Sequence, residues 1–410
     1  MTDIERLQRK TVWVLSSGQI MGGLGIGATA SVGALLAAEV SGSDVWSGMA
    51  ATMSTLGAAV LALPLARFAG RRGRRPALGF GSALAGASAI VLVFAATIGS
   101  FPLLLVAFAL AGAGSATNLQ ARFAATDLAR PAHRGRDLSL VVWSTTIGSV
   151  LGPNLIEPGE AIGEVLGLPT LTGPFVFTLA AQAFTVAIYL FGLRPDPLLV
   201  AKEALGTAPR ERPRLGFATL RINPRARFAV GSVALSHATM VALMAMTPVH
   251  LYGHGATLAI VGFTISLHIA GMFGLSPVFG WLADRVGRLP VLLGGQVILA
   301  AALIVAWLGS ESHALVGVSL VLLGLGWSAS TIAGSTMLVD SVPLGDRPGV
   351  QGVSDLMMNL AGAAGGALSG PLLTAFGYPG LGLVCMVLVA GVVVWALLRT
   401  SAPADELVEG

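Results

Sequence analysis

A few ionisable or polar side chains lie inside long apolar runs of this sequence, where they could handle a solute or a proton. A charge at the centre of a bilayer costs on the order of 2.5–3.5 kcal/mol, so such a group is kept for a function or a partner. Arg122 is the clearest basic example, and Asn118 lies one helical turn before it on the same face. Arg122 could bind an anionic or polar group of a solute, or its long side chain could simply reach out to water.

Two histidines, His237 and His268, fall near the middle of apolar runs. Imidazole titrates at about pH 6.5 when unperturbed, which suits a proton carrier. Either ring could instead be neutral and bonded to a hydroxyl, since Ser236 and Ser266 are close in sequence. Glu157 is a third candidate for the proton, unless it lies at the outer surface. Other polar or aromatic residues could line a substrate cavity: Gln19, Trp143, Trp327 and Asn359.

The sequence lacks the residue patterns that mark enzymes and metal or nucleotide sites. Neither a phosphate-binding loop nor a nucleophile triad occurs. His250 and His254 have i, i+4 spacing, but two imidazoles do not complete a metal site. We therefore predict no enzymatic activity, no metal and no cofactor.

Composition places these residues in a membrane protein. Hydrophobic residues make up 54% of the 410 residues, charged residues 11%, and the mean hydropathy is +0.81. A soluble protein carries about 25% charged residues, so a water-covered surface is excluded. Apolar runs of about 20 residues recur, long enough to cross a bilayer as helices, and they do not alternate as barrel strands do. The predicted fold class is all-α and integral to the membrane.

Twelve membrane-spanning helices are predicted, in two sets of six. Between the sixth and seventh lies the longest polar segment, residues 194–226, whose proline and arginine content is typical of a linker. Residues 1–193 are therefore predicted to form one six-helix bundle, and residues 227–410 a second. The predicted helices span residues 12–38, 46–68, 77–96, 102–127, 138–157, 173–193, 227–250, 258–280, 290–309, 314–338, 353–375 and 380–399.

Positive charge is distributed unevenly over this layout. If the N-terminus is placed in the cytoplasm, every lysine and arginine except Arg122 falls on the cytoplasmic side. Such asymmetry sets the topology of helical membrane proteins. We therefore predict a multi-pass protein of the inner membrane with both termini in the cytoplasm. The sequence pI near 9.8 comes from these short basic loops, so no nucleic acid partner is predicted.

One short basic turn occurs once in each half of the chain. GWLADRVGRLPVL at residues 280–292 aligns with a degenerate copy, ARFAGRRGRRPAL, at residues 66–78. The segments after the fourth and tenth helices also correspond, and each has an aspartate at the helix end, Asp127 and Asp340. Two related six-helix bundles around a central cavity are an architecture of transporters.

The loop at residues 280–288 resembles the hallmark G-x-L-A-D-R-x-G-R loop of the major facilitator superfamily. The matching residues are Gly280, Leu282, Ala283, Asp284, Arg285, Gly287 and Arg288. This resemblance implies two pseudo-symmetric six-helix bundles that act as a secondary active transporter by alternating access. Gly287 permits a tight turn. Asp284 could cap a neighbouring helix N-terminus or pair with an arginine of the other half, and so latch the inner face shut.

In the first half, the same loop keeps Arg71, Gly73 and Arg74, whereas Gly70 stands where the pattern has aspartate. Asp127 could supply the missing partner for either arginine. Alternatively, the arginine cluster only fixes the topology and binds anionic lipid.

A second motif lies in the predicted fifth helix, where Gly148, Gly152 and Pro153 form a G-x-x-x-G-P pattern. Glycines four apart let another backbone approach closely, and the proline permits a kink. The pattern resembles that of drug:proton antiporters in the same superfamily, although glycine-rich helices occur in many membrane bundles. The glycine pair that follows in those antiporters is absent, and so is their arginine in the fourth helix, where Phe108 stands.

The residues and resemblances together predict a proton-coupled exporter of a small amphipathic or drug-like solute, acting as a monomer among membrane lipids. A proton-coupled importer of a small solute is the nearest alternative. A non-transporting membrane sensor or lipid scramblase on the same scaffold is another. The sequence does not name the substrate, because hydropathy does not fix how each helix is rotated.

Overall fold

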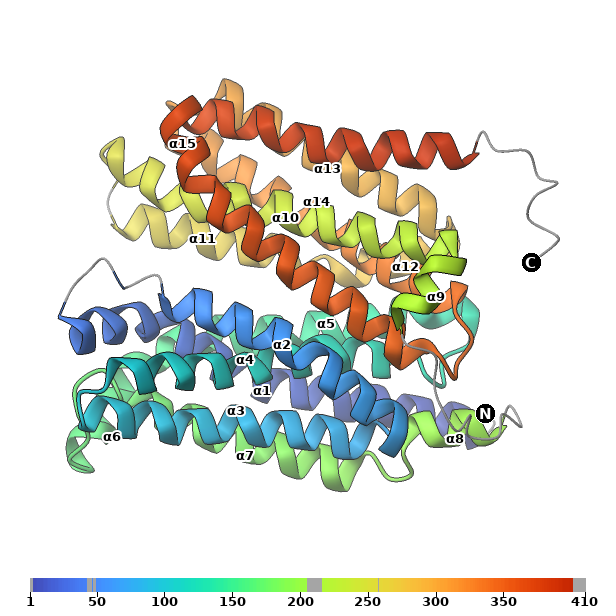
Figure 1. The fold of residues 1–410 in the computed structure, drawn as a ribbon, viewed down its shortest axis with the longest axis horizontal. Helices are drawn as coiled ribbons and strands as arrows, with labels where there is room; N and C mark the ends of the chain where they lie inside the picture. The colour runs from blue at the N-terminus through green and yellow to red at the C-terminus, as the bar shows by residue number, and fades with distance from the viewer. Residues whose placement is uncertain (1–2, 43–45, 47–48, 205–215, 257, 401–410) are drawn as a thin grey trace.

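The structure is a computed structural model that describes the backbone of residues 3–42, 46, 49–204, 216–256 and 258–400. Figure 1 shows two layers of long helices, with α1–α7 in one layer and α10–α15 in the other. The first layer contains α1 (Asp3–Ser41), α2 (Met49–Arg72), α3 (Arg74–Thr97), α4 (Phe101–Ala124), α5 (Arg134–Leu151), α6 (Ile156–Val165) and α7 (Pro174–Gly192). The second contains α10 (Pro224–Gly253), α11 (Leu258–Phe273), α12 (Ser276–Arg285), α13 (Arg288–Leu308), α14 (His313–Ser341) and α15 (Arg347–Thr400).

The helices are long and apolar enough to cross a membrane. Nine spans within the described residues meet that criterion, and in one of these α11 and α12 act together over Phe263–Arg285. Another, Arg347–Leu398, breaks at Gly377, where φ is 67° and ψ is 177°, and so makes two crossings. With α1 and the α5–α6 segment as further crossings, the predicted all-α membrane fold of twelve crossings is confirmed.

Helix boundaries differ from the prediction where helices extend past their apolar part. α1 begins at Asp3, α5 at Arg134 and α15 at Arg347, which is four to nine residues earlier than hydropathy indicated. Backbone hydrogen bonds continue through these charged turns, because a helix does not need apolar side chains where it leaves the bilayer. The predicted starts at residues 12, 138 and 353 were therefore too late.

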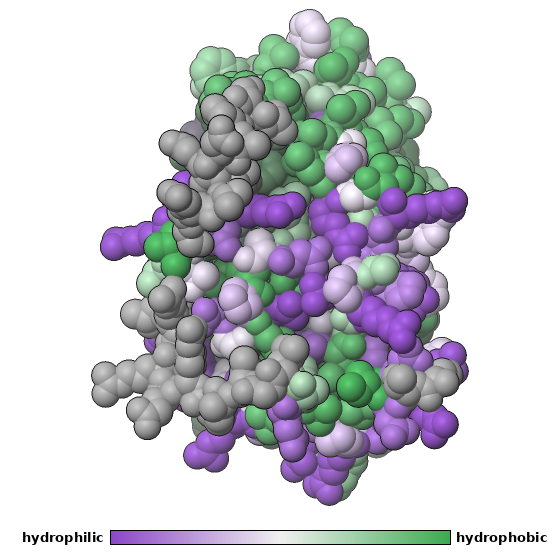
Figure 2. Space-filling model, turned by 90° about the vertical axis from the view of Figure 1, so that its right-hand side faces the viewer, coloured by the Kyte–Doolittle hydropathy of each residue, from purple (hydrophilic) through white to green (hydrophobic). Residues whose placement is uncertain are grey.

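The loops rich in arginine gather at one end of the bundle, where α1 begins and α15 ends (Figure 1). We call this the basic end. It carries the α2–α3 turn around Gly73, the segment 126–134 before α5, the α12–α13 turn around Gly287, and the α14–α15 loop. Figure 2 looks at this end and shows a broad band of hydrophilic residues across the junction of the two layers.

Each layer has its own buried apolar core. In the first, Leu92, Leu104 and Phe108 are fully buried in one cluster. In the second, Leu299, Leu320 and Leu323 play the same part. A further cluster at the basic end mixes the layers, because Phe123 of α4 packs in it with residues of α12 and α15. At this end α4 of the first layer therefore packs into the core of the second, while the main cross-layer packing is between α2 and α15 and between α5 and α12.

The proposed linker, residues 194–226, contains two short helices, α8 (Pro197–Ala204) and α9 (Gly216–Ile222), and residues 205–215 lie outside the described part of the chain. Leu198 and Ala201 of α8 are buried against Leu344 of the second layer. Lys202 Nζ donates a 2.8 Å hydrogen bond to the Gly70 carbonyl at the end of α2. The described linker residues therefore pack on the basic end of both layers.

The G-x-x-x-G-P motif lies where α5 ends. After Leu151 the chain makes a 3-10 turn, Gly152–Leu155, and then continues as α6. A proline lacks the backbone N–H that an α-helix needs, which is why the helix changes here. Gly148 faces α1 so closely that a Cβ atom would overlap the Ile20 carbonyl. The glycine therefore lets the backbones of α1 and α5 meet.

Candidate functional site

Arg74 lies at the centre of a buried polar cluster at the basic end. It is the first residue of α3, and Gly73 before it has a φ of 96°, which favours glycine. The Arg74 Nε and Nη2 atoms donate to both carboxylate oxygens of Asp127, at 2.7 and 3.1 Å. Nη1 donates to Gln120 Oε1 at 3.2 Å, and Nη2 also donates to Gln351 Oε1 of α15 at 2.7 Å. Arg74 thereby joins α3 and α4 to the second layer.

A second ion pair links α4 directly to α15. Arg122 Nη2 donates to Asp355 Oδ1 at 2.6 Å, and the two side chains are only 3% and 1% exposed. Gln120 Nε2 donates to the other Asp355 oxygen at 3.1 Å, so this glutamine connects the pair to the Arg74 cluster. Arg122 therefore does not reach water in this structure. Because both charges are buried, loss of either one would leave the other unpaired at a high cost in free energy.

Asp355 was missed by the sequence reasoning, although one signal could have found it. It is an acidic residue three positions inside the predicted helix 353–375, and the rule that singled out Arg122 applies to it as well. Asn359, a predicted substrate residue, lies one turn further along α15, and its Nδ2 donates to the Asp355 carbonyl at 2.8 Å.

Asp284, from the hallmark loop, caps the N-terminus of α5 in the other layer. Its carboxylate oxygens accept hydrogen bonds from the backbone N–H groups of Gly135 at 3.0 Å and Arg136 at 2.8 Å. Helix N-termini carry a partial positive charge, so a carboxylate is stabilised there. Arg288, one turn away, lies 2.9 Å from Asp284 Oδ1. The contact is thus a helix cap across the two layers, with its arginine partner in its own layer.

Asp340 forms a fourth bridge between the layers. Arg134 of α5 donates to its Oδ1 at 2.6 Å, and Arg288 donates to its Oδ2 at 3.0 Å. Arg288 Nη2 also donates to the Pro131 carbonyl of the first layer at 2.7 Å. The predicted gating residues Asp284, Arg288 and Asp340 are therefore brought together in one network.

Gly280 lets this network form, because it brings α12 against α5. A Cβ atom on Gly280 would overlap Ser139 and the Gly135 carbonyl. Ser276 Oγ, one turn before Gly280, donates to the Ser139 carbonyl at 3.3 Å. Gly287, the N-cap of α13, has a φ of 111°, the counterpart of Gly73 in the first half.

Two predicted gating arginines lie outside the network. Arg71 is exposed, and Asp127 pairs with Arg74 instead. Arg285 is also exposed, with its guanidinium 5.1 Å from the Trp281 ring centre. The N-terminus of α3 is capped by a carboxylate from the start of the linker, because Asp196 accepts the Arg75 backbone N–H at 2.7 Å.

Three predicted substrate residues and the predicted proton carrier His237 form two pairs deeper in the bundle. Gln19 Nε2 of α1 donates to the Asn118 carbonyl of α4 at 3.3 Å. In the second layer, Trp327 Nε1 donates to His237 Nδ1 at 2.9 Å, so this histidine nitrogen is an acceptor and carries no proton. Trp327 also packs edge-on against the ring of Phe273.

The remaining predicted residues are placed less centrally. His268 is fully buried, and its Nδ1 bonds the Leu320 carbonyl at 2.7 Å rather than a nearby serine. Trp143 is 38% exposed and faces a groove between α1 and α5, away from the ion pairs. The side chains of Glu157 and Pro153 lie outside the described residues. No group of three metal-ligating side chains occurs among the residues that the structure describes.

The cross-layer bonds of Arg74, Arg122, Asp284 and Asp340 all lie at the basic end. Opening a passage between the layers at this end requires all of them to break. The arrangement can therefore act as a closed gate whose bonds are ionic and helix-capping.

The sequence matches the family model described as Major Facilitator Superfamily over residues 15–255 and 228–410. A relative from Bacillus subtilis, named "Uncharacterized MFS-type transporter YdeG", is 39% identical over 398 residues, which cover 95% of this chain and 92% of the relative. The "Riboflavin transporter RfnT" of Brucella anthropi is 26% identical over 402 residues, 97% of this chain and 98% of that protein. The fold is similar to FucP in an outward conformation, with a TM-score of 0.71, 16% identity, and coverage of 95% of this chain and 99% of FucP.

Proposed function

Because the chain belongs to the major facilitator superfamily, as a multi-pass membrane transporter and not an enzyme, we propose that it moves a small solute by alternating access, coupled to protons. Residues 1–193 and 227–410 rock against each other about a central cavity, with residues 194–226 joining them. The basic end faces the cytoplasm of the inner membrane, as its positive charge favours. The structure then corresponds to the state that is closed toward the cytoplasm.

The observation that carries this proposal is the buried pair of Arg122 and Asp355. It connects α4 of one half to α15 of the other through a 2.6 Å hydrogen bond, among residues that are almost fully shielded from water. A bond of this kind is strong only while both members keep their charges. A single proton on the carboxylate therefore weakens the closed state.

Transport is coupled to protons because a proton and Arg122 compete for the Asp355 carboxylate. When Asp355 takes a proton from the outer side, the halves separate at the basic end, and the cavity opens toward the cytoplasm. Release of the proton there restores the ion pair, which favours closing after a solute has entered. One proton then moves inward for each solute moved outward, which is export by antiport. His237 is a second candidate for the proton, and its bond to Trp327 would link protonation to the cavity wall.

The residues that we propose for solute binding are the two deeper pairs together with Asn359. Gln19, Asn118 and Asn359 offer amide groups, and Trp327 offers an aromatic face. An amphipathic solute with a ring and polar substituents suits this set. The relative named as a riboflavin transporter makes riboflavin the first compound to test.

Reconstituted vesicles separate the candidate functions. Riboflavin is placed at equal concentration on both sides, and the outside is made more acidic than the lumen. Antiport lowers lumenal riboflavin in either protein orientation, because protons flow inward and solute flows outward. Symport raises lumenal riboflavin and would replace our exporter with an importer.

Matched variants test whether Asp355 carries the coupling. Asp355→Asn should abolish the pH-driven change while riboflavin still equilibrates across the membrane. Asp3→Asn, at a carboxylate that is 100% exposed, should transport as the unmodified protein does. If neither riboflavin nor a panel of amphipathic compounds moves under any gradient, the sensor or scramblase alternative gains.

A further inference from the structure

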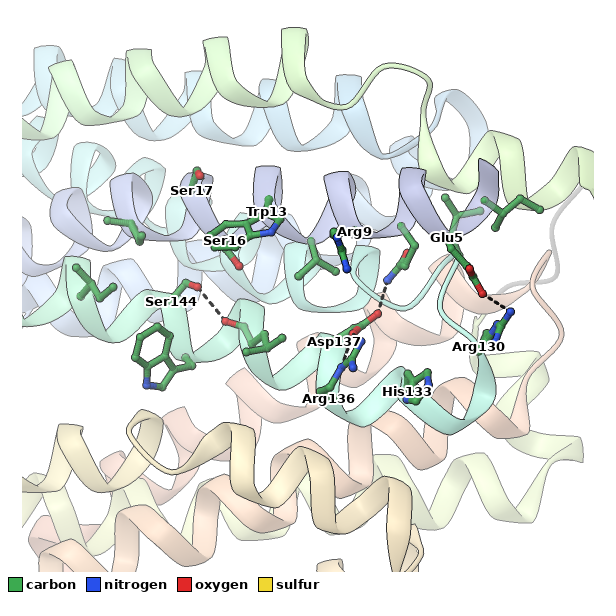
Figure 3. Close-up of a pocket in the computed structure, with 18 residues that line it drawn as sticks. Glu5, Arg9, Trp13, Ser16, Ser17, Arg130, His133, Arg136, Asp137 and Ser144 are labelled. Carbon is green, nitrogen blue, oxygen red and sulfur yellow. Dashed lines mark hydrogen bonds and ion pairs between the residues drawn. The ribbon is translucent and has the colours of Figure 1, made fainter. Parts of the chain in front are cut away.

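A groove of about 750 Å³ runs along the side of the first layer, between the half of α1 nearest the basic end and α5 (Figure 3). It opens laterally, because Trp13 on its rim is 69% exposed and Trp143 is 38% exposed. In a membrane this side of the bundle faces lipid. The Arg136 backbone N–H binds Asp284 of the cross-layer network, but the groove itself opens away from that network, and the proposed transport cycle does not use it.

The lining of the groove changes along its length. Near the basic end it is charged, and Figure 3 shows these side chains between the start of α1 and the start of α5. Toward the middle of the bilayer it becomes apolar, with serines between the aromatic residues. The charged part includes Glu5, Arg9, Arg130, His133, Arg136 and Asp137, and the apolar part includes Trp13, Ile20, Leu140, Trp143 and Ile147.

The arginines in the charged part of the groove differ in whether they have a partner. Arg130 pairs with Glu5, and Arg136 Nη2 lies 3.1 Å from Asp137, whose other oxygen accepts a 2.7 Å bond from Gln8. Within the described part of the chain, Arg9 has no ion pair or hydrogen bond from its side chain. The groove therefore presents a free guanidinium at the depth of the lipid headgroups.

The length of the groove fits one leaflet. Arg9 and Ile20 are eleven residues apart on α1, which corresponds to roughly 16 Å along a helix. Half the hydrocarbon thickness of a bilayer is about 15 Å. A molecule with a negative head at Arg9 would thus have its apolar tail beside Ile20, at about the bilayer centre.

We propose that this groove binds an anionic phospholipid of the leaflet at the basic end. The headgroup phosphate contacts Arg9, and an acyl chain lies along Trp13, Ile20 and Ile147. Basic side chains close to the membrane attract anionic lipid, and the lateral opening exposes the groove to lipid at high local concentration. A water-soluble partner cannot reach the apolar part, which lies within the bilayer.

Native mass spectrometry of the full-length protein in detergent tests the proposal. The delipidated protein is mixed with equal amounts of phosphatidylglycerol and phosphatidylcholine, and bound lipid is counted. Phosphatidylglycerol should be retained preferentially. Arg9→Gln should weaken it about five-fold, as expected for one cation near a membrane surface, and should leave phosphatidylcholine binding unchanged.

Two further variants, one inside the groove and one outside it, serve as controls for the lipid-binding experiment. Ser17→Trp, an exposed position on the apolar part of the groove, should weaken both lipids by blocking the chain. Arg72→Gln removes an exposed arginine of the basic end outside the groove and should bind as the unmodified protein does. Unfolding temperatures verify that each variant is folded. Equal binding of the two lipids by the unmodified protein, or an unchanged affinity in Arg9→Gln, overturns the proposal. Displacement of the lipid by riboflavin would instead make the groove a solute site.

Discussion

Removal of the Asp355 charge gives the strongest test of the gate. The Asp355→Asn substitution keeps the size of the side chain but leaves Arg122 as an unpaired charge in a site that is 3% exposed. In the open state that arginine regains water. The substitution should therefore destabilise the closed state relative to the open one, with less effect on the fold as a whole.

The size of the shift between the closed and open states follows from the burial of the Arg122–Asp355 pair. Removing one member of a buried ion pair costs about 3–5 kcal/mol, because the other charge is left unpaired. The asparagine can still accept a bond from Arg122, so we take the lower value, about 3 kcal/mol. That energy corresponds to roughly a 100-fold change in the equilibrium. A carrier that is about 1% open at the basic end would become about half open.

Distances between spin labels across the basic end measure this equilibrium. Arg72 at the end of α2 and Val286 after α12 are exposed positions in different halves, and the buried Cys385 can be replaced by alanine. The unmodified protein should give one short distance. Asp355→Asn should give a second, longer distance of similar weight.

A double substitution shows whether the effect belongs to the pair. Asp355→Asn with Arg122→Met leaves no charge unpaired, so much of the closed population should return. The reasoning is refuted if Asp355→Asn keeps the single short distance. It is also refuted if the two substitutions are simply additive, because the residues would then act independently.

Three further outcomes follow from the same structure. Asp284→Asn should weaken the cap on α5 by about 1 kcal/mol and increase the population with the long spin-label distance several-fold. Arg285→Gln, at an exposed position, should leave that population unchanged. Equal effects of the two substitutions would argue against the cap. Gly148→Ala should lower the free energy of unfolding by about 1–3 kcal/mol, because the new methyl group meets α1. Gly317→Ala, where no atom lies within 4 Å, should be neutral or slightly stabilising in the same unfolding assay. Trp327→Phe should reduce riboflavin affinity in equilibrium binding, and unchanged affinity would remove this residue from the solute site.

The membrane fold could be predicted because its cause is local. Apolar runs have to be helices in lipid, so the crossings were recognisable from single stretches of sequence. The break at Gly377 was also indicated, since the predicted helices ended at residue 375 and resumed at residue 380. Charged turns such as that at Arg347 were missed, because hydropathy ends before the helix does.

The candidate site could be predicted in part where the possible partners were few. Asp127 was expected to pair with Arg71 or Arg74, and in the structure it pairs with Arg74. Asp355 and Gln351 depend on how α15 is rotated, and an apolar pattern on all sides of a helix leaves that rotation open. The same uncertainty placed Trp143 among the cavity candidates, whereas the structure turns it to the lateral groove.

The close crossing of α5 and α12 bears on whether protons can leak across the membrane through this protein. Gly135 and Gly280 bring bare backbone against backbone there, with almost no volume between the two helices. A file of water molecules through such a seam would conduct protons and discharge the gradient. Glycine at this crossing leaves no room for such a file, so a bulkier residue at position 280 should separate the two helices and let protons leak.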